Sequence, residues 1–154
     1  MSEIFDKQAT LAGLSLGKAT EYKETYSPEL LQAVPRSMNR VELNLTTDLP
    51  FSGTDRWNGY ELSWLNPKGK PQVVIMRCEV PVSSPNLVES KSFKLYLNSF
   101  NQSYFDSIEA VSEALTKDLS RCADKQVDIA LFKPAEFSQM QIASFDALSI
   151  DDLD

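Results

Sequence analysis

The sequence contains no histidine, and this absence removes several kinds of chemistry at once. Without an imidazole the chain cannot form a Ser-His or Cys-His nucleophilic pair, and it cannot supply a histidine ligand to zinc. Any chemistry that this chain performs must therefore use carboxylates, lysines, hydroxyls, thiols or residues of a partner.

Cysteine is scarce as well, because the chain has only Cys78 and Cys122. Two distant cysteines provide neither a disulfide framework nor the spacing of a metal site, so we expect no bound metal. Cys78 lies in an apolar strand-like stretch, and Cys122 completes an apolar helical stripe. We interpret both as buried, reduced thiols, which is typical of a cytoplasmic protein.

The chain also has no long apolar run and no basic N-terminal region followed by one, so we expect neither a membrane span nor a targeting sequence. Its 22 acidic and 15 basic residues give a net charge of −7, which opposes binding along a phosphate backbone. We therefore expect no membrane partner and no direct nucleic-acid partner. The length of 154 residues fits one domain that buries roughly 70% of the surface of its unfolded chain.

The first fifty residues differ from the rest of the chain, because they are poorly periodic and are interrupted by Pro28, Pro35 and Pro50. We predict an N-terminal wrapping segment at residues 1–50, with little regular structure beyond a helical turn at residues 28–33. A folded module at 51–147 and an acidic tail at 148–154 complete the predicted organisation.

The pattern of the module predicts strands and helices in a definite order. Strand-like runs at 57–65 and 72–82 flank a turn-forming cluster and predict a hairpin. Apolar residues at helical spacing follow over 93–100 and 108–122, and strand-like alternation returns at 126–132 and, less clearly, at 139–145. We place the helix starts at Asn86 and Asp106, each with a glutamate three residues later as in a capping box.

This order predicts an α+β fold in which an antiparallel four-stranded sheet carries two helices on one face (ββααββ). Such a sheet has edges and an open face that need cover. We therefore expect self-association through the sheet edges, for example as a homodimer, or a partner module.

The densest polar patch is residues 86–94, where a loop is expected to enter the first helix. A helix N-terminus favours an anionic or hydrogen-bond-accepting ligand group. Glu89 could accept the paired N–H donors of a guanine-like base, Ser90 could donate or accept, and Lys91 could meet a phosphate. The alternative, which spacing alone favours, is that Glu89 closes a capping box with Asn86 while the lysines are solvated.

Other residues have weaker functional interpretations. Arg36 and Arg40 could bind a phosphate, although arginines in an irregular segment more often hold a loop in place. Trp57, Tyr60 and Trp64 suit a strand that packs against the helices, so we interpret them as core residues rather than as a surface for base stacking. The sequence has no glycine-rich phosphate loop and no dinucleotide-binding fingerprint.

Several stretches resemble the long, two-module form of the 7-cyano-7-deazaguanine reductase family. They are Leu11 to Lys18 (LAGLSLGK), Val34 to Arg40 (VPRSMNR), Tyr60 to Asn66 (YELSWLN) and residues 86–102. The last stretch contains Glu89-Ser90-Lys91-Ser92-Phe93-Lys94-Leu95-Tyr96, which is similar residue for residue to the signature motif of the family. The similarity covers nearly the whole chain, and it implies a tunnelling-fold module.

The resemblance implies an NADPH-dependent nitrile reductase of queuosine biosynthesis, in which a cysteine adds to the nitrile and NADPH reduces the thioimide to the aminomethyl product. In the long form the nucleophilic cysteine, the aspartate proton donor and a His-Glu pair lie in the C-terminal module and have no counterpart here. The resemblance assigns Val88, Glu89 and Ser90 to the substrate, Ser90 and Lys91 to NADPH, and no catalytic residue to this chain.

We therefore expect an N-terminal half whose acidic tail leads to an absent catalytic module, and which is catalytically silent alone. One alternative is a non-catalytic purine- or pterin-binding module, or a dimerisation module. A zinc-dependent GTP cyclohydrolase of the same fold is nearly excluded, because its metal site needs histidine.

Overall fold

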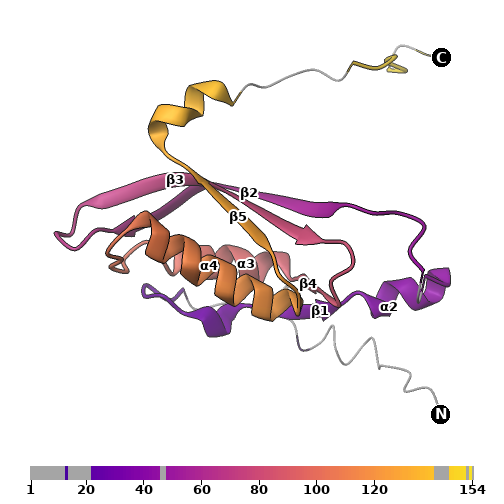
Figure 1. The fold of residues 1–154 in the computed structure, drawn as a ribbon, viewed down its shortest axis with the longest axis horizontal. Helices are drawn as coiled ribbons and strands as arrows, with labels where there is room; N and C mark the ends of the chain where they lie inside the picture. The colour runs from indigo at the N-terminus through magenta and orange to yellow at the C-terminus, as the bar shows by residue number, and fades with distance from the viewer. Residues whose placement is uncertain (1–12, 14–21, 46–47, 141–145, 152, 154) are drawn as a thin grey trace.

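The computed structural model describes residues 13, 22–45, 48–140, 146–151 and 153 of the chain (Figure 1). These residues form a three-stranded antiparallel sheet of order β2-β3-β5, a separate two-stranded ribbon of β1 and β4, and three α-helices. In chain order the elements are η1 (Pro28–Leu30), β1 (Ala33–Pro35), α2 (Ser37–Arg40), η2 (Val41–Leu43), β2 (Thr54–Leu65), β3 (Pro71–Pro81), β4 (Asn86–Val88), α3 (Ser90–Asn98), α4 (Ile108–Ala123), β5 (Asp128–Phe132) and η3 (Pro134–Gln139).

The predicted hairpin is confirmed as the β2-β3 pair, which begins at Thr54↔Pro81 and ends at Leu65↔Pro71. The turn between the strands is organised by Asn66, whose side-chain oxygen accepts hydrogen bonds from the backbone N–H groups of Lys68 and Lys70 at 3.0 and 2.9 Å. Local side-chain capping of this kind is the reason why Asn is favoured in turns.

A β-bulge interrupts the hairpin where Tyr60 and Glu61 lie between the pairs Gly59↔Met76 and Leu62↔Val74. Two residues of β2 therefore stand opposite one residue of β3, and the inward-facing positions change from odd to even numbers along the strand. This shift explains why the aromatic residues of β2 alternate badly in the sequence although the strand is continuous.

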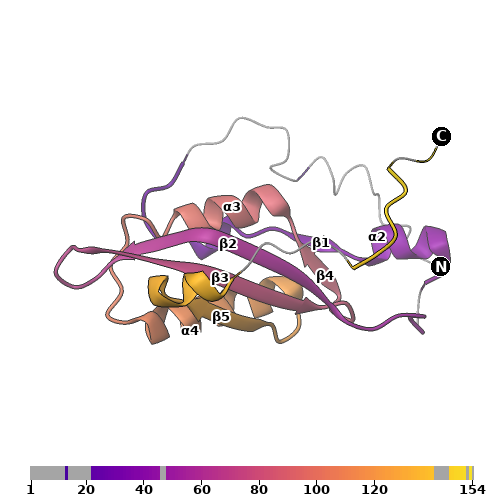
Figure 2. The same cartoon turned by 90° about the horizontal axis from the view of Figure 1, so that it is seen from above.

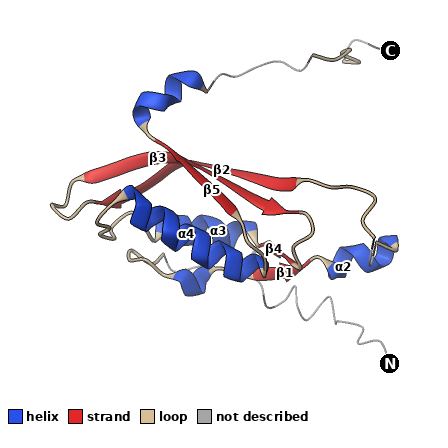
Figure 3. Cartoon of the chain, viewed as in Figure 1, coloured by secondary structure: helices blue, strands red, loops and turns tan. Residues whose placement is uncertain are grey.

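Helices α3 and α4 lie side by side on one face of the three-stranded sheet, as predicted (Figures 1 and 2). The core between these layers contains residues from both helices and from the inner face of the sheet, and the largest of its fully buried side chains include Met76, Tyr96, Phe100, Leu115 and Leu119. The opposite face of the sheet carries no α-helix among the described residues, and η3 lies on that side (Figure 3).

Both predicted helix starts are wrong, by three residues and by one. The N-cap of α3 is Glu89 rather than Asn86, because residues 86–88 form the strand β4 instead of a helix entry. The N-cap of α4 is Ser107 rather than Asp106, and its hydroxyl accepts a hydrogen bond from the N–H of Ala110 at 3.1 Å. Serine is as good an N-cap as aspartate, so the sequence pattern alone could not separate the two.

The predicted four-stranded sheet is also wrong in the described part of the chain, where the main sheet has three strands. The sequence pattern predicts the fourth strand at residues 139–145. Residue 139 ends the 3-10 helix η3, and residues 141–145 lie outside the described residues. The boundaries predicted for the wrapping segment, the module and the acidic tail stay predictions.

Residues 22–45 are more regular than predicted, because they contain β1, α2 and two short 3-10 helices. The segment before β1 packs against the helices. The ring of Tyr26 lies edge-on to that of Phe100, 5.1 Å between centroids, and its hydroxyl donates a hydrogen bond to the buried carboxylate of Asp118, which also accepts one from Tyr96 at 2.9 Å. This part of the N-terminal segment is therefore integral to the core.

Candidate functional site

The predicted ligand-binding residues lie at one structural joint, where β4 ends and α3 begins. Val88 is the last residue of β4, Glu89 is the cap between the two elements, and Ser90 and Lys91 start the helix. Val88 and Glu89 are almost completely buried, at 4% and 6% exposure, whereas Ser90 is exposed and Lys91 is half-buried.

Glu89 caps α3 with both carboxylate oxygens. Its Oε1 accepts a hydrogen bond from the backbone N–H of Lys91 at 2.8 Å, and its Oε2 accepts one from that of Ser92 at 2.7 Å. The hydroxyl of Ser92 donates to the backbone carbonyl of Glu89 at 2.8 Å. The side chain and the main chain of Glu89 are thus both held by the helix that they start.

This geometry changes the sequence-based hypothesis of an anion site at the start of α3. The carboxylate of Glu89 is itself the anion at that helix end, because it already accepts the N–H groups of Lys91 and Ser92. A phosphate could not use these two donors without displacing the glutamate. Capping does not by itself exclude base recognition, because a carboxylate has about four acceptor positions.

A groove of about 290 Å³ runs between β2 and α3, and Ser90 lies on its rim. The apolar lining residues of the groove include Trp57, Met76, Phe93 and Leu97. The polar lining residues include Glu61, Ser90, Lys94 and Asn98. Gly59 allows the side chain of Met76 to pack close to the backbone of β2, because a Cβ at this position would lie only 3.3 Å from Cε of Met76. The spacing of Ser90, Lys94 and Asn98 places all three on one face of α3.

The three aromatic residues of β2 have different environments. Trp64 is buried at 3% exposure, and Trp57 packs edge-on to Phe93 with 5.5 Å between ring centroids, so the core interpretation is confirmed for these two. It is wrong for Tyr60, which is 67% exposed, because the bulge turns this residue away from the helices.

Both cysteines are buried, as predicted, and neither is suited to act as a nucleophile. Burial away from water raises the pKa of the Cys78 thiol to about 12, and burial also raises the pKa of Cys122 to about 11. A thiol with such a pKa is protonated at neutral pH, whereas the thiolate is the reactive form.

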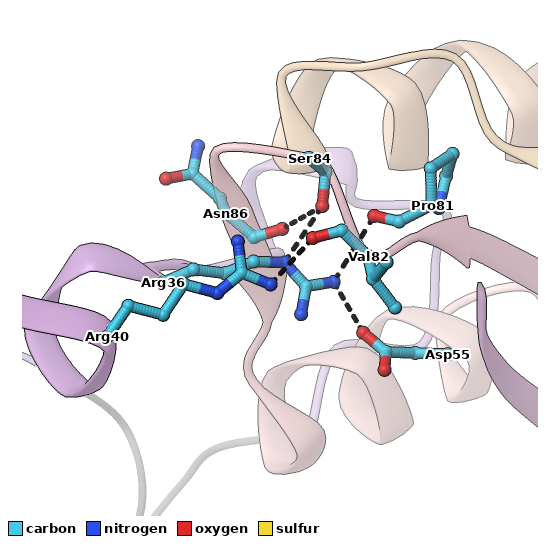
Figure 4. A network of polar contacts seen from close by, with 7 residues as sticks. All are labelled: Arg36, Arg40, Asp55, Pro81, Val82, Ser84 and Asn86. Atoms are coloured by element: carbon cyan, nitrogen blue, oxygen red, sulfur yellow. Dashed lines mark hydrogen bonds and ion pairs between the residues drawn. The ribbon is translucent and has the colours of Figure 1, made fainter. Parts of the chain in front are cut away.

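Arg36 and Arg40 hold the loop that leads into β4 (Figure 4). Arg36 donates from Nε to the hydroxyl of Ser84 at 3.0 Å and from a terminal nitrogen to the carboxylate of Asp55. Arg40 donates to the carbonyl of Val82 at 2.6 Å. The interpretation of these arginines as residues that hold a loop is confirmed; the roles of Ser84 and Asp55 were missed, because nothing in their local sequence indicates a buried partner.

Within the described residues, no helix has the length and apolar character that crossing a membrane requires.

A comparison with protein families identifies the class of this domain. Residues 22–131, which include the β4-α3 joint and both walls of the groove, match a family model for the N-terminal domain of a nitrile reductase. The chain belongs to this family, the N-terminal domains of 7-cyano-7-deazaguanine reductase, which act in queuosine biosynthesis.

Proposed function

We propose that this chain is the base-recognition half of an NADPH-dependent 7-cyano-7-deazaguanine reductase, with Val88, Glu89 and Ser90 binding the substrate. The observation that carries this proposal is the carboxylate of Glu89, which is 6% exposed and is oriented by two backbone N–H groups before any ligand arrives. A preorganised acceptor of this kind loses little freedom when a ligand binds.

In the proposed complex, Glu89 accepts hydrogen bonds from the adjacent N–H groups on the guanine-like edge of the substrate. A charged acceptor strengthens these bonds, and removal of the carboxylate from water makes them more discriminating against a base that lacks the donors. The backbone of Val88 and the hydroxyl of Ser90 complete the proposed contacts from the same joint.

For NADPH we propose contacts to Ser90 and Lys91. These residues fit the cofactor in chemistry, because Ser90 is an exposed hydroxyl on the groove and Lys91 carries a cation in the first turn of α3. The proposed phosphate contact rests on the lysine side chain, since Glu89 already uses the N–H groups of Lys91 and Ser92. When bound, NADPH would supply the hydride.

We further propose that the nucleophilic cysteine and the proton donor come from a second module. The burial of Cys78 and Cys122 supports this, since neither thiol opens onto solvent as a reactive thiolate would. The order of the described elements from β2 onwards, a hairpin, two helices and a strand, supports the proposal of a tunnelling-fold module. We also propose that such modules assemble through their sheet edges and that the protein acts in the cytoplasm.

Calorimetric titration of the chain with 7-cyano-7-deazaguanine tests the binding role. We expect Glu89→Gln to abolish measurable binding, because an amide presents one acceptor where the carboxylate presents two. Glu109→Gln is the matched control, since Glu109 lies in the first turn of the other long helix. Equal binding by the wild-type chain and Glu89→Gln would refute the role of Glu89.

A second assay follows NADPH oxidation with the chain alone and the nitrile substrate. No turnover is expected, because no residue of this chain is assigned as the nucleophile. Turnover that depends on Cys78 or Cys122 would show that the assignment of the nucleophile to another module is wrong.

A further inference from the structure

The β1-β4 ribbon carries the proposed ligand-binding residues, and a continuous set of backbone contacts defines its register. The pairs run from Ala33↔Val88 to Pro35↔Asn86. The pairing continues beyond both ends, because the N–H of Glu89 donates to the carbonyl of Gln32 and the N–H of Arg36 donates to that of Pro85, each at 2.9 Å. Glu89 therefore lies at one end of this ribbon and Arg36 at the other.

The guanidinium of Arg36 connects the ribbon to the main sheet. It is 8% exposed, and its donors reach three different segments: Asp55 at the start of β2, the carbonyl of Pro81 at the end of β3 at 3.5 Å, and the hydroxyl of Ser84 in the turn before β4. The hydroxyl of Ser84 in turn donates to the carbonyl of Asn86, the first residue of β4, at 2.8 Å (Figure 4).

Two further side-chain contacts hold the ribbon: the N–H of Gln32 donates to the hydroxyl of Ser92 at 3.0 Å, and Nδ2 of Asn86 donates to the carbonyl of Cys122 at 3.2 Å. The strands of the ribbon have three residues each, and Val88 is the only residue of the two strands that is fully buried. Register is strongly specified where one face of a sheet is buried, and is weakly specified elsewhere. A slip of one residue would break the hydrogen bond from the N–H of Glu89 to the carbonyl of Gln32, which joins the cap residue to the segment before β1.

We propose that Arg36 is a positioning residue of the substrate site, which fixes the register of β1 on β4 and thereby the direction of the Glu89 carboxylate. The link to substrate rests on the function proposed above. The guanidinium is suited to this role because its planar set of donors binds three acceptors at once, which a lysine ammonium on a flexible stem does not reproduce.

The test compares Arg36→Lys with Arg56→Lys. Arg56 also forms an ion pair from β2, but its partner is Glu79 on the neighbouring strand β3, so its loss is not transmitted through the ribbon to Glu89. Amide hydrogen exchange of Lys91 and Ser92 reports the Glu89 cap directly. We expect Arg36→Lys to accelerate exchange at both amides by about tenfold, the size that loss of one or two hydrogen bonds produces. The amides in the middle of α4 should keep their wild-type rates.

Ser84→Ala is the second variant, because it leaves the pair of Arg36 with Asp55 in place and removes the hydroxyl that links Arg36 to Asn86. It should accelerate the same two amides, and it decides the question if Arg36→Lys does not fold. Unchanged exchange at Lys91 and Ser92 in Ser84→Ala, or equal effects of Arg36→Lys and Arg56→Lys, would overturn the proposal.

Titration of the same variants with 7-cyano-7-deazaguanine adds the functional measurement. A loss of affinity of about tenfold in Arg36→Lys, at a temperature where the variant is fully folded, distinguishes positioning from stability alone. If the wild-type chain does not bind, the proposed function fails, while the exchange rates still decide whether Arg36 positions Glu89.

Discussion

The helix-covered sheet and the β1-β4 ribbon are held together by different forces. The sheet and its helices bury a continuous set of apolar side chains, of which Met76, Leu115 and Leu119 are fully inaccessible. The ribbon is held mainly by polar contacts of Arg36, Ser84 and the backbone. Apolar packing is non-directional and supplies stability, whereas hydrogen bonds fix direction and distance.

The difference explains where the proposed site lies. A carboxylate that must meet two donors of a base needs a fixed direction, which the hydrogen bonds to Lys91 and Ser92 provide. The core holds α3 in place, and the backbone N–H groups of this helix donate those bonds. Substitutions in the two regions should therefore have different effects, which the following measurements can separate.

Alkaline pH should have the largest effect, and it should act on the core. The pKa of a cysteine thiol is ordinarily about 9.0, and burial raises the pKa of Cys78 to about 12 and that of Cys122 to about 11. Burial and the neighbouring Asp118 also raise the pKa values of Tyr26 and Tyr96. Because the folded state holds these protons more tightly than the unfolded chain, the stability that the thiols contribute is present below about pH 9 and is lost as the pH rises toward 11 or 12.

The expected slope is about 1.4 kcal/mol per pH unit for each group that titrates only in the unfolded chain. Urea unfolding between about pH 7 and 11 measures it. Cys78→Ala should have a shallower slope above about pH 9 than the wild-type chain, whatever its stability at neutral pH. A free energy of unfolding that stays level over this range would contradict the prediction.

Truncation of a buried core side chain should have the second-largest effect on stability. Leu115 is completely buried in α4, so Leu115→Ala should lower the free energy of unfolding by about 3 kcal/mol through the lost burial and the cavity. The groove side of α3 is untouched, so the affinity of the folded fraction for 7-cyano-7-deazaguanine should not change. Leu148→Ala is a suitable control, since Leu148 is 89% exposed. An equal loss of stability in both variants would show that the assigned core is wrong.

The smallest effect should come from deletion of Glu61. The bulge places two residues of β2 opposite one of β3, so removal of one of them leaves every other inward-facing residue on the same side. We expect the deletion to change the free energy of unfolding by about 1 kcal/mol or less, as for other surface changes. Deletion of Val74, a buried residue of β3, is the control and should unfold the sheet, because it moves the following side chains to the other face.

Much of the core could be predicted from the sequence, because apolar periodicity reports it directly. The stripe at Val111, Leu115 and Leu119 predicts α4, and the apolar run from Val74 to Val80 predicts β3. The ribbon could not be predicted in this way. Its two strands have three residues each and pair over a long sequence separation, so no local period marks them.

The sequence names the residues of the candidate site, whose binding roles stay predictions, but it does not give their arrangement. The sequence pattern indicates Glu89 both as a capping residue and as a base acceptor, and the structure places it as the cap itself. The contacts of Arg36 with Asp55 and Ser84 join residues that no local pattern relates. Partners of this kind are visible only when the fold brings distant segments together.

The long separation between the strands of the ribbon has a consequence for the order of folding. The β2-β3 hairpin closes through the short turn at Asn66, whereas the pair Ala33↔Val88 closes a loop that contains the whole hairpin. Loop closure costs entropy that grows with loop length, so the hairpin is expected to form before the ribbon. The hairpin brings residues 53 and 82 together, where the N–H of Val82 donates to the carbonyl of Gly53 at 3.0 Å. The segment that presents Glu89 is therefore expected to acquire its native contacts after the hairpin has formed.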